Sequence, residues 1–325
     1  MSMAADHVSP IARIGRFLRD NPVVTLVILL LALVALLEVL RPGIVNERWI
    51  GNTVKFAIPL AMLAACQTLT MLTGGIDLSA SVVATISAFV VATQMPQVGT
   101  GPAVVLSLLP AVLIGLVNGF GVGICRVHPL IMTLATGLVG TGCLQVYQRG
   151  VIATGSTVPA FLEWLGTGRT WMVPNALFLF LPFAILLLLA QRRTGFGRLL
   201  YAVGANENAA RLSGVRAWQV YLALYALSGL IAGVTGLLYV GLIKAPSLSL
   251  AEPLLLPSVA AAVIGGTSIF GGRGSYSGTI VGALILTVLN TLLTLLQMPE
   301  GARRILFGGI ILAVTTVYVR LTDQG

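Results

Sequence analysis

Charged residues are scarce in this sequence. Asp, Glu, Lys and Arg together make up 9% of its 325 residues, whereas hydrophobic residues make up 57%, and the mean hydropathy is +0.99. Soluble domains carry roughly 25% charged residues, so this composition excludes an ordinary soluble protein. Long apolar runs recur instead, and a run of about 20 residues can cross the roughly 30 Å core of a bilayer. These runs are continuous rather than short and alternating, which excludes a transmembrane β-barrel.

Residues for catalysis and metal binding are also few. The chain has two His and three Cys, and it lacks the H-E-x-x-H, G-x-S-x-G and phosphate-loop patterns. Cys66, Cys125 and Cys143 lie in or beside apolar runs without the spacing of metal ligands, so we interpret them as small buried apolar residues. We expect no enzyme activity, no metal site and no nucleotide site in this chain.

The positions of the apolar runs predict an all-α integral membrane protein with about ten transmembrane helices. We expect them at 22–40, 53–73, 78–94, 102–125, 129–149, 172–190, 219–242, 255–270, 276–296 and 302–320. The polar residues 1–21 precede a run of full span length, which predicts an N-terminal tail rather than a cleavable signal peptide. Residues 22–325 are then a single transmembrane domain.

Basic residues outnumber acidic ones by 19 to 10. They lie mostly in short loops between spans, where they set orientation or meet lipid headgroups, so their excess does not indicate nucleic acid. The longest polar loop, 191–218, contains five arginines and a single acid, Glu207. We therefore expect this loop to be cytoplasmic. With six spans before it and four after it, both termini are expected to be cytoplasmic as well.

The stretch Thr73–Ser79, "TGGIDLS", interrupts two apolar runs. In one interpretation, Gly74 and Gly75 form a turn, and Asp77 or Ser79 caps the next helix by accepting its first free N–H groups. In the other, residues 74–79 form a broken or re-entrant segment within the membrane, where an ionisable residue is a functional candidate. The two interpretations are compatible.

Neutral polar side chains recur inside the predicted spans. Together with Asp77 they form our candidate substrate pathway, which consists of Gln67, Thr70, Asp77, Asn118, Thr133 and Asn290. Amides and hydroxyls with almost no buried charge suit a neutral polyhydroxylated solute better than an ion. The alternative for each residue is an interhelical hydrogen bond, which is common for Asn and Thr in membranes.

Within the 191–218 loop, "GANENAARLSGV" predicts a short isolated helix. Asn206 is a candidate N-cap, Glu207 and Arg211 are spaced for an i,i+4 ion pair, and Gly214 can close the helix in a left-handed conformation. Ala209, Ala210 and Ser213 would present a small-residue face to a partner. The alternative is a solvated helix that contacts no other protein.

Five stretches carry a family resemblance when taken together and in order: "LTGGIDLS", "GLVNGF…HPLIMTLAT", "AVGANENAARLSGV", "VIGGTSIFGGRGSYSGTIVGALI" and "LNTLLTLL". They extend over roughly 55–320 and resemble the permease subunits of bacterial ATP-binding-cassette importers for monosaccharides such as ribose, xylose, galactose and arabinose. One departure is that Thr291 follows Asn290 where the family pattern has "NG".

The resemblance implies a multi-pass protein of the bacterial inner membrane that binds no cofactor itself. Its implied partners are cytoplasmic ATPase subunits that bind ATP and Mg, a second permease copy or a related permease, a periplasmic sugar-binding protein and membrane lipid. The ATPase would dock on the predicted loop helix, through Gly204, Asn206, Glu207, Ala209, Ala210, Arg211, Ser213 and Gly214. The competing hypothesis is a stand-alone secondary transporter or channel for a small neutral polar solute.

Overall fold

The computed structural model describes residues 22–151 and 155–299, and scattered positions between 301 and 312. Eight of the described helices are long and apolar enough to cross a membrane, which confirms the all-α membrane class. They are α2 (Pro22–Leu40), α3 (Glu47–Leu72), α4 (Ala80–Val98), α5 (Thr100–Gly123), α6 (Pro129–Val151), α8 (Ala176–Arg193), α11 (Ala217–Ile243) and α13 (Tyr276–Leu295).

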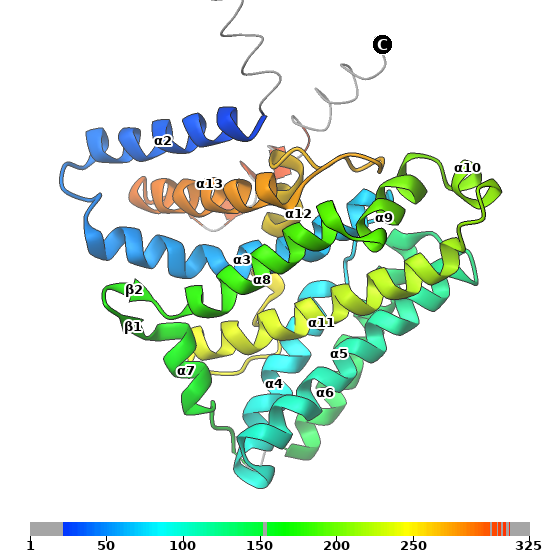
Figure 1. Cartoon of the computed structure of the whole chain (residues 1–325). Coiled ribbons are helices and arrows are strands. Elements are labelled where there is room, and N and C mark those ends of the chain that lie inside the picture. Colours follow the sequence, from blue (N-terminus) through cyan, green and yellow to red (C-terminus); the bar gives the residue numbers. More distant parts are fainter. Residues whose placement is uncertain are drawn as a thin grey trace, which may run out of the picture.

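Shorter elements lie at the two ends of this helical bundle (Figure 1). At one end are α7 (Ala160–Thr167) and a two-stranded antiparallel hairpin of β1 (Arg169–Thr170) and β2 (Val173–Pro174), in which Arg169 faces Pro174. At the other end are α9 (Gly195–Ala205) and α10 (Glu207–Leu212). We call these the hairpin end and the α10 end. The 3₁₀ turn η2 (Glu252–Leu254) leads into α12 (Leu255–Ile264).

Helices α3 and α11 form the centre of the bundle. The most apolar 18-residue window of α3 is 83% buried and that of α11 is 67% buried, whereas that of α2 is only 6% buried. Glycines allow α11 and α5 to pack with their backbones close together, because a Cβ added at Gly229 would lie 2.2 Å from the carbonyl oxygen of Ala111. Small residues are the usual basis of close helix packing in membranes.

Eight of the ten predicted spans correspond to a long helix, with ends that differ by a few residues. The largest shift at an N-terminus is in α3, which begins at Glu47, because Asn46 caps it by accepting the Trp49 N–H at 3.0 Å. The predicted span 302–320 and the tail 1–21 lie largely or wholly outside the described residues.

The predicted span 255–270 is wrong. Helix α12 has ten residues, which at 1.5 Å per residue gives about 15 Å, half of a bilayer core. It ends because Gly265 is followed by Gly266, whose φ of +86° begins a turn. The glycine-rich loop 265–275 then connects α12 to α13. Helix α13 packs so closely against the end of α12 that a Cβ added at Gly278 would lie 2.0 Å from the Gly265 carbonyl oxygen.

The cysteines also differ in part from expectation. Cys66 is buried, and its thiol donates to the carbonyl of Ser228 at 3.3 Å. Cys125 and Cys143 are exposed, so their prediction as buried residues is wrong. Cys143 lies on α6, whose apolar window is only 22% buried; an apolar side chain there faces outward, where lipid takes the place of a protein core.

The α5–α11 contact predicts that a Gly229→Leu substitution destabilises the fold. The added side chain would meet the Ala111 backbone, and overpacking of this kind costs about 1–3 kcal/mol. We expect a lower melting temperature of the detergent-solubilised protein. Gly142→Leu is the matched control, because a Cβ at this helical glycine of α6 meets nothing within 4 Å. Equal melting temperatures of the two variants would contradict the prediction.

Candidate functional site

The "TGGIDLS" stretch is a partly buried, non-helical break between α3 and α4. Helix α3 stops at Leu72, Gly74 has a φ of +76°, and regular helix resumes at Ala80. Asp77 is only 2% exposed and Ser79 only 1%. The expectation of a broken segment near 74–79 is therefore confirmed.

The backbone of this break is satisfied by side chains from two helices. The Gln67 amide of α3 donates to the Asp77 carbonyl at 2.8 Å and accepts the Asp77 N–H at 3.2 Å. The Thr133 hydroxyl of α6 donates to the Ile76 carbonyl at 3.0 Å and accepts the Leu78 N–H at 3.1 Å. Non-helical backbone is tolerated at membrane depth only when its polar groups are bonded in this way or line a cavity.

The Asp77 carboxylate lies at the centre of a side-chain network. Its Oδ1 accepts the Ser79 N–H at 3.0 Å and the Ser79 hydroxyl at 2.6 Å. Its Oδ2 accepts the Ser228 hydroxyl of α11 at 2.6 Å. Of the two candidate caps, Asp77 thus accepts a free N–H at the start of α4, whereas Ser79 makes no capping bond.

The network continues outward from Ser79. Asn118 of α5 donates to the Ser79 hydroxyl at 2.9 Å, and the Thr136 hydroxyl of α6 donates to the side-chain oxygen Oδ1 of Asn118 at 2.6 Å. Residues of α4, α5, α6 and α11 are therefore held to one another around Asp77. Ser228 was not predicted, although it is a serine in the middle of an apolar span.

Four of the predicted pathway residues, Gln67, Asp77, Asn118 and Thr133, therefore meet at the break, with their polar atoms bonded inside the chain. Thr70 stays apart from this group, because its hydroxyl donates to the Cys66 and Gln67 carbonyls of its own helix. Asn290 lies elsewhere. A pathway role for these residues remains a prediction.

Asn290 lines a cavity of about 520 Å³ between α3, α11, η2, α12 and α13. The side chains around it include two aromatic rings, Phe56 and Tyr239, and the acid Glu252. Arg303, which also lines the cavity, donates to the side-chain oxygen Oδ1 of Asn290 at 3.4 Å. Among the described residues, no group of His, Cys, Asp and Glu side chains is arranged to hold a metal ion.

At the α10 end, the short helix forms as the sequence predicts. The Asn206 side chain accepts the Ala209 N–H at 2.9 Å, and Gly214 closes the helix with a φ of +86°. Glu207 forms the expected ion pair with Arg211. The cap, the Gly214 closure and the ion pair each involve residues within one or two turns, which is why the sequence alone reveals them.

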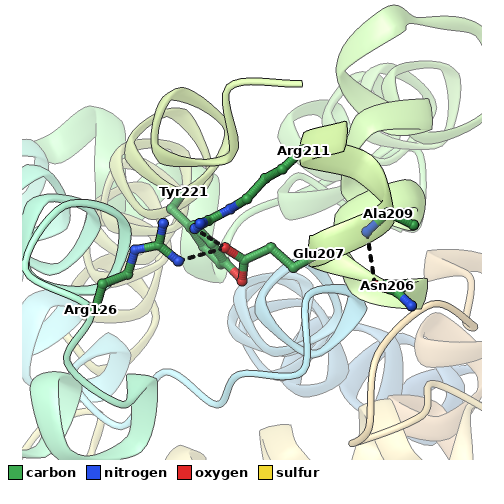
Figure 2. Close-up of polar contacts among 6 residues, drawn as sticks. All are labelled: Arg126, Asn206, Glu207, Ala209, Arg211 and Tyr221. Atoms are coloured by element: carbon green, nitrogen blue, oxygen red, sulfur yellow. Dashed lines mark hydrogen bonds and ion pairs between the residues drawn. The ribbon is translucent and has the colours of Figure 1, made fainter. Parts of the chain in front are cut away.

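Glu207 also has two partners that are distant in sequence (Figure 2). Its Oε1 accepts from Arg126, in the α5–α6 connection, at 2.9 Å, and its Oε2 accepts from the Tyr221 hydroxyl of α11 at 3.0 Å. The carboxylate therefore points toward the helical bundle. Arg126 and Tyr221 were not predicted.

Apart from Asn206, the exposed N-cap, the predicted coupling residues fall into two groups. Gly204, Glu207, Ala210 and Arg211 face the bundle: Ala210 is 7% exposed, and a Cβ at Gly204 would lie 1.7 Å from the Leu72 carbonyl oxygen. The outer face consists of Ala209, Ser213 and Gly214, all exposed, together with Leu212, which is 91% exposed and was not predicted.

Helix α9 connects α10 to the rest of the bundle through what we call the α9 junction, formed by Tyr201, Gly204, Leu72, Gly272 and Gly274. The Gly272 N–H donates to the Leu72 carbonyl at 2.9 Å, and the Tyr201 hydroxyl donates to the Gly274 carbonyl at 2.7 Å. Burial raises the pKa of the Tyr201 phenol, which keeps this donor protonated. Movement of α9 would therefore reach both the glycine-rich loop and the end of α3.

Residues 49–315 match the family described as "Branched-chain amino acid transport system / permease component". The chain is 33% identical to the ribose import permease RbsC of Escherichia coli K12, over 89% of this chain and 91% of that protein. It is 34% identical to the galactofuranose transporter permease YtfT of the same strain (80% and 76%) and 29% identical to the fructose import permease FrcC of Rhizobium meliloti (97% and 90%). No solved structure matches.

The Asp77 network predicts that Asp77→Ala destabilises the protein strongly. The change leaves the Ser79 N–H and the Ser79 and Ser228 hydroxyls without an acceptor, at a cost of about 3 kcal/mol. The measurement is thermal unfolding in detergent. Thr70→Ala is the control: it removes an equally buried hydroxyl that bonds only to its own helix, so we expect a loss below about 1 kcal/mol. Similar stability of the two variants would refute the structural role of Asp77.

Proposed function

Because this chain belongs to the family of permease components of the branched-chain amino acid transport system, we propose that it is the transmembrane permease of an ATP-driven importer that carries a monosaccharide across the bacterial inner membrane. The observation that carries the sugar assignment is the similarity to permeases named for ribose, galactofuranose and fructose over 80% to 97% of this chain. The family description names amino acids instead, so an amino acid belongs in the test.

The position of α10 supports coupling to a separate ATPase. This helix stands at one end of the bundle (Figure 1), and its outer face of Ala209, Leu212, Ser213 and Gly214 is exposed. Five arginines between residues 191 and 218 favour a cytoplasmic location for this end. We assign the outer face to ATPase docking and the hairpin end to the periplasm.

Glu207 then has an internal role. Through Arg126, Arg211 and Tyr221 it fixes α10 to the α5–α6 connection and to α11. A displacement of α10 by the ATPase is thereby passed to these spans. Such a displacement shifts the permease between two states only if the ATPase contacts those states differently.

The complete importer would contain a second permease, identical or related, two ATPase subunits that bind ATP and Mg, and a periplasmic sugar-binding protein. A stand-alone carrier is the competing hypothesis. Ion-coupled carriers use intramembrane ionisable groups, whereas the Asp77 carboxylate here is already bonded to three donors of the chain itself.

The transport test uses proteoliposomes that contain the permease with its ATPase, supplied with the binding protein. We expect ATP-dependent uptake of at least one of D-ribose, D-fructose and D-galactose, and no uptake of leucine. Uptake without ATP or without the ATPase would favour the stand-alone carrier. Uptake of leucine alone would overturn the sugar assignment.

The coupling assignment predicts different outcomes for the two faces of α10. Leu212→Asp puts a charge on the outer face and should abolish co-purification of the ATPase. Glu207→Gln leaves that face intact, so we expect the ATPase to be retained while sugar uptake per ATP hydrolysed falls at least about fivefold.

Trp171→Asp is the control for Leu212→Asp, because Trp171 is 93% exposed at the hairpin end and Leu212 is 91% exposed at the α10 end. Capture of the ATPase by Trp171→Asp should equal that of the wild type. Loss of the ATPase in Glu207→Gln would instead mean that this carboxylate contacts the ATPase directly.

A further inference from the structure

We propose that the 520 Å³ cavity between α3, α11, α12 and α13 is a binding site for a single monosaccharide on its way through the membrane, with Glu252 and Asn290 as hydrogen-bonding groups and Phe56 and Tyr239 as apolar walls. The inference rests on the proposed transport function and adds the place and the chemistry of sugar recognition. Cavities of about 300–1,000 Å³ with apolar walls and a few converging polar groups are typical ligand sites.

The lining matches the two kinds of surface that a sugar presents. The C–H faces of the ring are apolar and pack against aromatic side chains, here Phe56 and Tyr239. The hydroxyl groups donate to carboxylates and amide oxygens and accept from amide and guanidinium groups. Glu252, Asn290 and Arg303 supply all of these partners in one cavity, and hydrogen bonds to a charged group are the stronger ones.

The polar groups of the cavity retain hydrogen-bonding capacity, unlike those around Asp77. In the part of the chain that the structure describes, the Glu252 carboxylate has no hydrogen-bond or ion-pair partner. The Asn290 side chain has one long contact, at 3.4 Å from Arg303. Both residues are exposed, so they can bond to a ligand without first breaking a strong internal interaction.

The depth of the cavity argues against an ordinary surface location. Asn290 lies five residues before the last residue of α13, Leu295, which corresponds to about 7 Å along the helix. Exposed side chains in the middle of α6 are apolar, as with Leu138 and Val139. Polar residues at membrane depth face protein or a water-filled cavity. The face that carries Glu252 and Asn290 therefore lines an aqueous space.

The cavity is also connected to the α10 end. Two of its walls, α12 and α13, are joined at their far ends by the glycine-rich loop 265–275. That loop belongs to the α9 junction, where Gly272 bonds to Leu72 and Gly274 accepts from Tyr201. Motion of α9 and α10 therefore acts on the helices that shape the cavity, so the ATPase can change its affinity for sugar.

The experiment measures sugar occupancy and uptake separately. For occupancy, Asn290→Cys is introduced in the complete importer together with Cys125→Ser and Cys143→Ser, which remove the two exposed thiols. A water-soluble thiol reagent should modify the introduced cysteine. We expect at least one of D-ribose, D-fructose and D-galactose to slow this modification at least about fivefold, and leucine to leave its rate unchanged.

Gln145→Cys in the same background is the matched control. Gln145 is also an exposed neutral amide, and it lies six residues before the end of α6, a depth similar to that of Asn290 in α13. Sugar should not protect this position. For uptake, Glu252→Gln and Asn290→Ala should lower the initial rate about tenfold, as expected for one lost hydrogen bond to the sugar, whereas Gln145→Ala should match the wild type.

The cavity assignment is overturned if no sugar protects position 290, if positions 145 and 290 are protected equally, or if Glu252→Gln and Asn290→Ala import sugar at the wild-type rate. Failure of the proposed function looks different: the wild type then imports none of the three sugars. Because thiol protection is measured without transport, it tests the cavity in that case too.

Discussion

The hydrogen bonds around Asp77 are the interaction on which the rest of the structure depends. A membrane interior offers no water to an interrupted helix, so the backbone groups of residues 73–79 must be bonded within the chain. Gln67 and Thr133 bond to the backbone of residues 76–78, and carbonyls at the end of α3 accept the N–H groups of residues 73–75. The Asp77 carboxylate accepts from Ser79 at the start of α4 and from Ser228 of α11. The break at residues 73–79 thus positions four spans relative to one another. This role explains why two glycines and Asp77 interrupt an otherwise apolar stretch.

The break also divides the bundle into two packing groups. Helix α11 packs against α5, α4 and α3, whereas α13 packs against α12, α3 and α2, so α3 belongs to both groups. Residues 73–79 join α3 to α4 of the first group. The α9 junction touches the end of α3 at Leu72, so α10 is linked to the point where the two groups meet. A force applied at α10 therefore acts on the break between α3 and α4.

Sequence analysis succeeded where the cause was local. Asn206, Glu207, Arg211 and Gly214 act within one short helix, and long apolar runs define most spans. It failed where a residue depends on a partner distant in sequence: Arg126 and Tyr221 bond to Glu207, and Ser228 bonds to Asp77. The predicted span 255–270 was also too long, because "VIGGTSIF" is apolar enough to extend it to residue 270. In the structure, Gly265 and Gly266 end α12 at Ile264. There, close packing against α13 decides the helix length, and hydropathy alone does not reveal it.

Two asparagines show how the same residue type serves opposite purposes in a membrane. Asn118 is 1% exposed, donates to Ser79 and accepts from Thr136, so it holds helices together. Asn290 is exposed in a cavity beside Glu252. A passing solute must be bound favourably enough to enter and weakly enough to leave, which requires polar groups that are not already committed to strong internal bonds. By this criterion we propose that the polar residues with free hydrogen-bonding capacity, rather than the most deeply buried ones, belong to the pathway.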